Sequence, residues 1–92
     1  MHYIAPTPED LERLKNELGK SSGEMADLFC LANGRQWRRY LSETKSNGRD
    51  MSMPMLFFAM ARLELDAETL NRILNRMREV GAIIDLDSPS QP

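Results

Sequence analysis

Apolar residues recur at helical spacing in the first part of the chain. We expect a helix over residues 8–18, because Thr7 and Pro8 are typical of a helix start and Gly19 is typical of a helix end. Its apolar positions lie three and four residues apart: Leu11, Leu14 and Leu18. This spacing predicts one apolar face that packs against the rest of the domain.

Two shorter helices are expected next. Ser21 and Glu24 have the spacing of a capping box, which predicts a second helix over about residues 22–29. After a turn that ends at Asn33, a third helix extends to about Ser42, with Asn33 as its cap. The inward positions of these two helices are apolar: Met25, Ala26, Leu28, Phe29, Trp37, Tyr40 and Leu41.

The second half of the chain predicts two further helices. After a polar loop over residues 43–53, Pro54 opens a helix that is apolar nearly all round until Arg62, so we expect it to be the central buried helix. Asp66 caps a fifth helix, which Gly81 ends. The apolar stripe of this fifth helix contains Ala67, Leu70, Ile73, Leu74, Met77 and Val80.

The predicted fold class is therefore all-α, with five helices in one domain and a short C-terminal extension. We divide the chain into an N-terminal arm (1–6), a helical domain (7–81) that contains the short helix pair (21–42), and the extension (82–92). Within the extension, residues 82–86 favour β-structure.

Charge is distributed unevenly along the chain. The formal net charge of the 92 residues is −2, yet residues 1–34, 35–49 and 50–92 carry −3, +4 and −3. The basic segment coincides with the third helix and the loop after it. Because local potential governs docking on phosphate, this segment favours a polyanion as partner, and the acidic flanks predict modest, salt-sensitive affinity.

Several classes of function are disfavoured. A single cysteine allows no internal disulfide and too few ligands for a cysteine-based metal site. We find no glycine-rich phosphate loop and no nucleophile paired with a base, so we expect no enzyme, no catalytic residue, no cofactor and no metal. The chain has no apolar run of about 20 residues and no signal-peptide pattern, so we expect a cytoplasmic protein without a membrane partner.

Hydrogen-bond donors gather on the outward side of the third helix. Arginine can bond to guanine through two parallel hydrogen bonds, so these positions suit base edges in the DNA major groove. Arg35, nearest the helix start, is the first candidate, and Arg38 lies one turn further on. Arg39 suits a base or a phosphate, and Gln36 is turned partly sideways. The candidate base contacts are Gly34, Arg35, Gln36, Arg38 and Arg39.

Other residues suit the phosphate backbone and the packing of the helix pair. Hydroxyls at the start of the second helix and polar side chains after the third would fix the register on DNA: Ser21, Ser22, Lys45, Asn47 and Arg49. A small residue is needed where the two helices cross, and bulky residues must set the angle of the third. Ala26, Phe29, Trp37 and Tyr40 meet these needs.

The stretch from Thr7 to Leu65 resembles the lambda-repressor-like helix-turn-helix domains, the Cro and repressor (XRE-like) superfamily of phage and bacterial regulators. The matching residues are Leu18-Gly19, Ser21, Glu24-Met25-Ala26, Leu28-Phe29, Leu31 to Arg35, Trp37 to Tyr40, and Pro54 before an apolar helix. The resemblance implies a five-helix domain that binds DNA through its third helix. Two departures are that Cys30 stands where the family usually has glycine, and that the turn is one residue longer, with Trp37 rather than Gln36 inward.

Some residues admit two interpretations. Trp37 could stack on a base, but its shared face with Tyr40 and Leu41 favours the core. Cys30 is expected to be a small buried hydrophobe, with redox sensing as the alternative. Seven methionines could form a copper site or fill gaps in the core, and we favour the core.

The function expected from these features is sequence-specific binding of double-stranded DNA, as a transcriptional repressor or autoregulator. A homodimer is expected because one short helix reads few base pairs. Its interface would contain Ile73, Met77, Val80, Ile83 and Ile84, which could instead close the core of the monomer. The rival functions are an antitoxin-like or phage accessory protein with a protein partner, and a module that binds protein alone.

Overall fold

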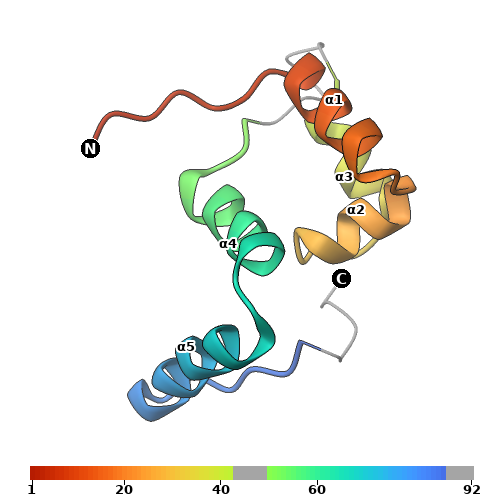
Figure 1. Cartoon of the computed structure of the whole chain (residues 1–92). Coiled ribbons are helices and arrows are strands. Elements are labelled where there is room, and N and C mark those ends of the chain that lie inside the picture. Colours follow the sequence, from red (N-terminus) through yellow and green to blue (C-terminus); the bar gives the residue numbers. More distant parts are fainter. Residues whose placement is uncertain (43–49, 87–92) are drawn as a thin grey trace.

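The computed structural model describes residues 1–42 and 50–86, and this part of the chain is all-helical, without a strand (Figure 1). It contains five helices: α1 (Pro8–Leu18), α2 (Ser22–Leu28), α3 (Gly34–Tyr40), α4 (Met53–Glu64) and α5 (Ala67–Val80). The prediction of an all-α fold with five helices is confirmed. No helix in the described residues is long and apolar enough to cross a membrane.

Every helix begins with a side-chain cap. Five N-cap side chains accept a hydrogen bond from the backbone N–H three residues further on: Thr7, Ser21, Asn33, Ser52 and Asp66. This satisfies one of the unpaired N–H groups at each start. The boundary predictions need small corrections, since α2 ends at Leu28, α3 ends at Tyr40 and α4 begins at Met53, before Pro54. The cap of α4 is Ser52, because its hydroxyl accepts from Met55 N–H.

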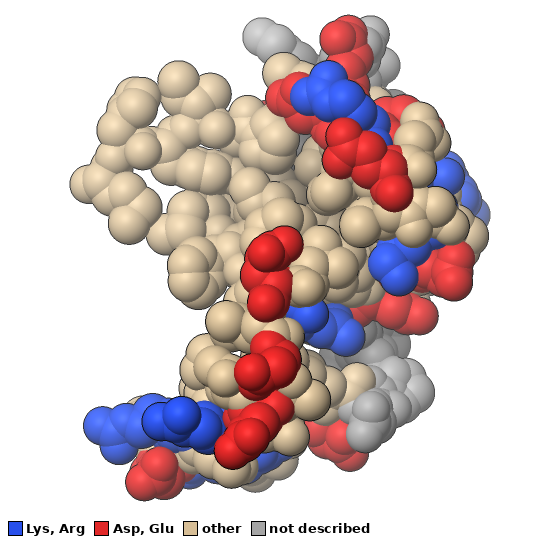
Figure 2. Space-filling model, in the orientation of Figure 1, with Lys and Arg blue, Asp and Glu red and all other residues tan. Residues whose placement is uncertain are grey.

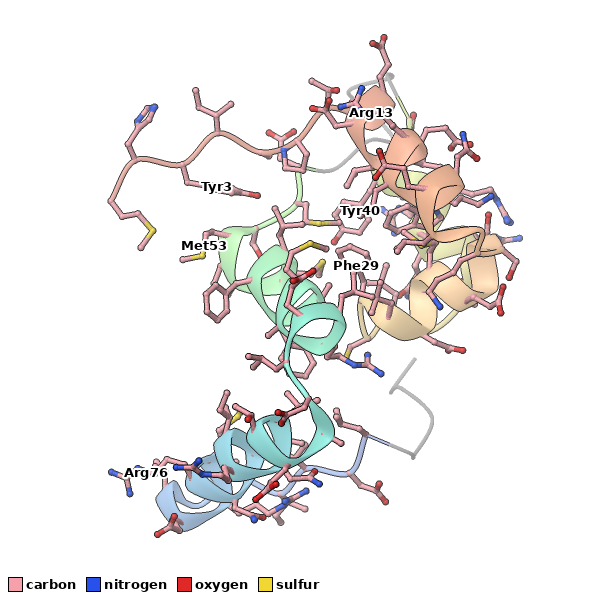
Figure 3. All side chains as sticks on the ribbon, viewed as in Figure 1. Tyr3, Arg13, Phe29, Tyr40, Met53 and Arg76 are labelled. Carbon is pink, nitrogen blue, oxygen red and sulfur yellow. The ribbon has the colours of Figure 1, made fainter. Side chains whose placement is uncertain are left out.

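One core joins α1 to α4. The largest fully buried side chains are Trp37, Met25 and Met51, and the cluster also contains Leu11, Ala26, Leu28, Phe29, Tyr40 and Ala59. Figure 3 shows Phe29 and Tyr40 pointing into the space between the first three helices and α4. Met55 and Met60 pack against this cluster, so these methionines fill the core as expected.

The prediction that α4 is the central buried helix is wrong. Only Ala59 is fully buried in this helix, and Phe57 is 69% exposed. The reason is geometric: Figure 1 shows α1, α2 and α3 together on one side of α4, so these three helices cover only that side. An apolar sequence therefore overstated the burial of this helix.

The extension also differs from expectation. Residues 82–86 form no strand, because the described part of the chain offers no neighbouring strand with which to pair. They are held beside α5 instead, where the Arg78 guanidinium donates to the carbonyl of Ile84 at 2.9 Å. At the other end of the chain, the Tyr3 hydroxyl donates to the carbonyl of Met51 at 2.7 Å and ties the N-terminal arm to the start of α4.

Candidate nucleic-acid interface

The helices α2 and α3 make the most extensive helix contact among the described residues. Gly34, the first residue of α3, faces the first turn of α2. A Cβ added at Gly34 would lie 3.2 Å from both Gly23 N and Ser22 Cβ. The expectation that Gly34 faces outward is therefore corrected: the absence of a side chain lets α3 approach the backbone of α2.

The turn between these helices is a Schellman motif built on a cysteine. Leu31 N–H donates to the carbonyl of Ala26 at 2.8 Å, and Cys30 N–H donates to that of Asp27 at 3.2 Å. Cys30 adopts a φ of 58°, in the left-handed region that favours glycine. The prediction that Cys30 is buried is wrong: it is exposed, because this conformation ends the helix and turns the residue toward solvent.

Two side chains complete the turn. Asn33 Oδ1 accepts from Gln36 N–H at 3.1 Å, and Gln36 Oε1 accepts from Ala32 N–H at 3.0 Å. Gln36, expected to be turned partly sideways, therefore holds the residues before α3. Its side-chain oxygen is engaged within the protein, which limits what it can offer to a ligand.

The inner side of α3 is fixed by two aromatic residues. Trp37 is fully buried and Tyr40 is 6% exposed. The rings of Trp37 and Phe29 lie 5.1 Å apart at 36°, a distance typical of packed aromatic pairs. The predicted core residues of the helix pair, Ala26, Phe29, Trp37 and Tyr40, are all buried, so the core interpretation of Trp37 is confirmed. Among the described residues, Trp37 Nε1 has no hydrogen-bond partner.

The outer side of α3 carries the three arginines. Arg35, Arg38 and Arg39 are exposed, and none of them makes a hydrogen bond or ion pair within the described part of the chain. Their positions i, i+3 and i+4 place them on one face. An anchored helix therefore presents three cations to solvent.

The start of α2 is occupied by its own capping box. Ser21 Oγ accepts from Glu24 N–H at 3.1 Å, and the Glu24 carboxylate accepts from Ser21 N–H at 2.8 Å. The bond from Ser21 N–H lowers the pKa of Glu24, so its charge persists at this helix end. The negative charge of that carboxylate would repel a phosphate bound at Ser21 and Ser22. Each serine hydroxyl can still donate a hydrogen bond to a phosphate oxygen.

The other predicted positions lie in different regions. Lys45, Asn47 and Arg49 lie outside the described residues. Ile73, Met77, Val80 and Ile83 are exposed and Ile84 is half-buried, so they do not close the core of the monomer. The alternative that they fill the monomer's own core is excluded for the four exposed residues.

Arg62 is a residue that sequence reasoning missed. Its Nη1 donates to the carbonyls of Asp27 and Leu28, at 2.8 Å each, and lies 3.8 Å from Cys30 Sγ. It therefore caps the C-terminus of α2 from α4. The available signal was an arginine in an apolar helix, together with a second helix that has no basic residue in its last turn.

Comparison of this chain with protein-family models, with curated proteins and with solved structures finds no match.

Proposed function

We propose that this protein binds double-stranded DNA by placing α3 in the major groove, and that it acts as a transcriptional regulator, in the form of a repressor or autoregulator. One observation carries the proposal: a short helix is fixed from inside by Trp37 and Tyr40 and presents outside three arginines that have no partner among the described residues. A cation face without partners in the described part of the chain is available to an anionic ligand. The resemblance to lambda-repressor-like domains points to the same function.

The dimensions suit the major groove. An α-helix with its side chains is about 10–12 Å across, and the major groove is about 12 Å wide. In a helix-turn-helix, the N-terminal residues of the second helix approach the base edges. Arg35 is therefore the proposed base contact, Arg38 the next one, and Arg39 a contact to a base or a phosphate.

Gly34 and Gln36 have a supporting role in this proposal. Gly34 allows the start of α3 to sit against Ser22 and Gly23, and Gln36 holds the turn through Ala32 N–H. Both fix the angle at which the arginines leave the protein. Since a displacement of about 1 Å is enough to misplace a bidentate contact, this support bears directly on specificity.

A second candidate is a protein-binding function, as in an antitoxin-like or phage accessory protein. The observation that favours it is the position of the exposed large apolar side chains in the described residues. All of them lie outside α1, α2 and α3: Met1, Ile4, Phe57, Leu63, Ile73, Met77, Val80 and Ile83. Figure 2 shows an uncharged surface over the N-terminal arm and the start of α4. The two functions are compatible, because they use different surfaces.

The test is a salt titration of binding to the DNA upstream of the gene for this protein, with a scrambled duplex beside it. The double variant Arg35→Ala, Arg38→Ala should weaken binding at least about thirtyfold, at roughly 1 kcal/mol or more per lost contact. It should also reduce the slope of log affinity against log salt. The matched control is Arg13→Ala, which removes an exposed arginine from α1.

Each outcome has a defined meaning. Tight, salt-sensitive binding to the upstream duplex that is lost in the double variant supports an autoregulator. Equal binding to both duplexes supports DNA binding but shows that the upstream sequence is not the specific target. A selection from random duplexes should then identify the target. Absence of binding at low salt refutes the proposal and leaves protein binding as the function to pursue.

A further inference from the structure

The solvent side of α5 carries two rows of side chains along the helix. Ile73 and Met77, which are 44% and 43% exposed, form an apolar row that Val80 prolongs. Arg72 and Arg76 form a second row beside it, because each of them directly precedes one of these apolar residues. The two rows border one shallow hollow, which is lined by Thr69, Arg72, Ile73, Arg76, Met77 and Glu79.

The two arginines of this hollow differ from the third arginine of the same helix. Arg78 is engaged within the protein, since it donates to Asn75 Oδ1 at 2.7 Å and to the carbonyl of Ile84 at 2.9 Å. Neither Arg72 nor Arg76 makes a hydrogen bond or ion pair within the described part of the chain. Figure 3 shows Arg76 projecting from α5 away from the other helices. Both guanidinium groups are therefore available to a molecule outside the chain.

The hollow carries an excess of positive charge. Two arginines and one glutamate, Glu79, are the charged residues that line it. Arg72 and Arg76 lie one helical turn apart, and like charges at this spacing repel each other. Carboxylates supplied by an occupant would relieve this repulsion, so the charge of the hollow favours an acidic molecule.

We infer that this hollow binds an acidic amphipathic helix of a partner protein, in which an apolar row lies beside carboxylates one turn apart. The apolar row would cover Ile73 and Met77, and the carboxylates would accept hydrogen bonds from the guanidinium groups of Arg72 and Arg76. A helix suits the hollow because both rows of α5 have a spacing of one turn, which a second helix can match in both rows at once. The inference rests on the second candidate function, protein binding, and does not depend on DNA binding by α3.

Two other occupants fit the hollow less well. A nucleic-acid backbone supplies phosphates but no apolar surface, so it would leave Ile73 and Met77 uncovered. A second copy of α5 brings the same two arginines. A parallel pair places Arg72 beside Arg72 of the copy, and an antiparallel pair centred between Ile73 and Met77 places Arg76 within about one helical turn of Arg76 of the copy. Like charges meet in both arrangements.

The test is fluorescence anisotropy of three labelled helical peptides that are titrated with the full chain. The first peptide carries a row of leucines beside a row of glutamates, each with a spacing of one turn. Lysines replace the glutamates in the second peptide, and serines replace the leucines in the third. An interface of one helix is at the small end of the range for specific complexes, so we expect the glutamate peptide to bind with a dissociation constant on the order of 10–100 µM. The other two peptides should bind at least about tenfold more weakly.

Charge reversal on the protein gives the decisive comparison. The double variant Arg72→Glu, Arg76→Glu should bind the glutamate peptide at least about tenfold more weakly, and it should bind the lysine peptide more tightly than the unmodified chain does. A variant that gains affinity for the lysine peptide has kept its fold, so its loss of the glutamate peptide is not caused by unfolding.

Two control variants separate this hollow from the rest of the surface. The double variant Arg13→Glu, Lys15→Glu makes the same change in net charge on α1 and should bind the glutamate peptide like the unmodified chain. The double variant Arg35→Ala, Arg38→Ala should also bind this peptide unchanged. If the chain fails to bind DNA but binds the glutamate peptide, only the proposal for α3 is refuted.

Three results would overturn the inference. Equal affinity for the glutamate and lysine peptides means that Arg72 and Arg76 do not select the partner. Undiminished affinity for the serine peptide means that the hollow takes any anion, a nucleic-acid backbone included. Sedimentation velocity of the full chain tests the remaining occupant: a dimer whose stability changes in Arg72→Glu, Arg76→Glu assigns this face to a second copy.

Discussion

Replacing Arg62 by methionine should destabilise the protein more than any other single exchange of a half-buried or exposed charge. Arg62 Nη1 donates to the carbonyls of Asp27 and Leu28, both at 2.8 Å. These are among the last carbonyls of α2, which have no partner within the helix. Methionine keeps an unbranched side chain of similar length and removes only the donor and the charge.

The magnitude follows from these contacts. A hydrogen bond from a charged donor contributes about 1.5–3 kcal/mol to stability. Because a single nitrogen serves both carbonyls, we assign the two bonds together a contribution within that range. The guanidinium also lies 5.8 Å from the centre of the Phe58 ring, a cation–π contact of about 0.5–1 kcal/mol at a partly exposed site. Water replaces part of the loss, so we expect a net cost of about 2 kcal/mol. For a domain of this size, that lowers the Tm by about 8–16 °C.

Thermal unfolding followed by circular dichroism measures this directly. Arg62→Lys should lower the Tm about half as much, because lysine keeps the charge but its compact ammonium group is more strongly hydrated. Arg13→Met is the control: it breaks an exposed ion pair with Asp10 at 2.7 Å and should lower the Tm by about 2 °C or less. If Arg62→Met melts within about 2 °C of the unmodified chain, the cap on α2 contributes no stability and the reasoning fails.

Three further predictions concern the helix pair. Cys30→Gly should raise the free energy of unfolding by about 1 kcal/mol, because glycine adopts a positive φ without strain, whereas Cys30→Ala should not. In denaturant titrations, Gly34→Ala should lower the free energy of unfolding by about 1 kcal/mol, because the added Cβ overlaps with the backbone of α2. A Cβ at Gly23 would lie 3.9 Å from Ser21 Oγ, so Gly23→Ala should raise the free energy of unfolding by about 0.5 kcal/mol. If Gly34→Ala proves more stable than Gly23→Ala, this description of the packing between α2 and α3 is refuted. The pKa of Glu24 is lowered in the folded protein, so its carboxylate stabilises the fold at pH values above the ordinary glutamate pKa of about 4.3. This contribution to the free energy of unfolding is lost as the pH falls through the pKa of the folded state. The Tm of Glu24→Gln should therefore decline less between about pH 5 and pH 3 than that of the unmodified chain. If the Tm of the two proteins falls equally with pH, Glu24 does not contribute this stability.

Local sequence signals predicted the helices well because their caps act locally. Thr7, Ser21, Asn33 and Asp66 all cap as expected, since each bond spans only three residues. The apolar pattern also identified the buried face of α3, because Trp37 and Tyr40 lie one turn apart. These features need no knowledge of how the helices are arranged in space.

Features that depend on distant segments could not be predicted in the same way. Phe57 is 69% exposed although the sequence of α4 is mostly apolar, and composition cannot show which side of a helix its neighbours cover. Arg62 reaches carbonyls 34 and 35 residues away in sequence. Gly34 is predicted to face outward beside the arginines, yet its contact with Ser22 is set by the angle between α2 and α3.

The length of the turn decides which side chains of α3 face outward. Successive helix residues advance by about 100°, so Trp37 and Tyr40 together define one inward direction. Arg35, Arg38 and Arg39 then lie within about 50° of the opposite direction. A turn shorter by one residue would bring Gln36 inward and rotate the helix by about 100°, which would carry Arg39 toward the core. The full burial of Trp37 excludes that register. This turn, with Cys30 in a left-handed conformation and Arg62 capping α2, is therefore what allows all three arginines to face solvent together.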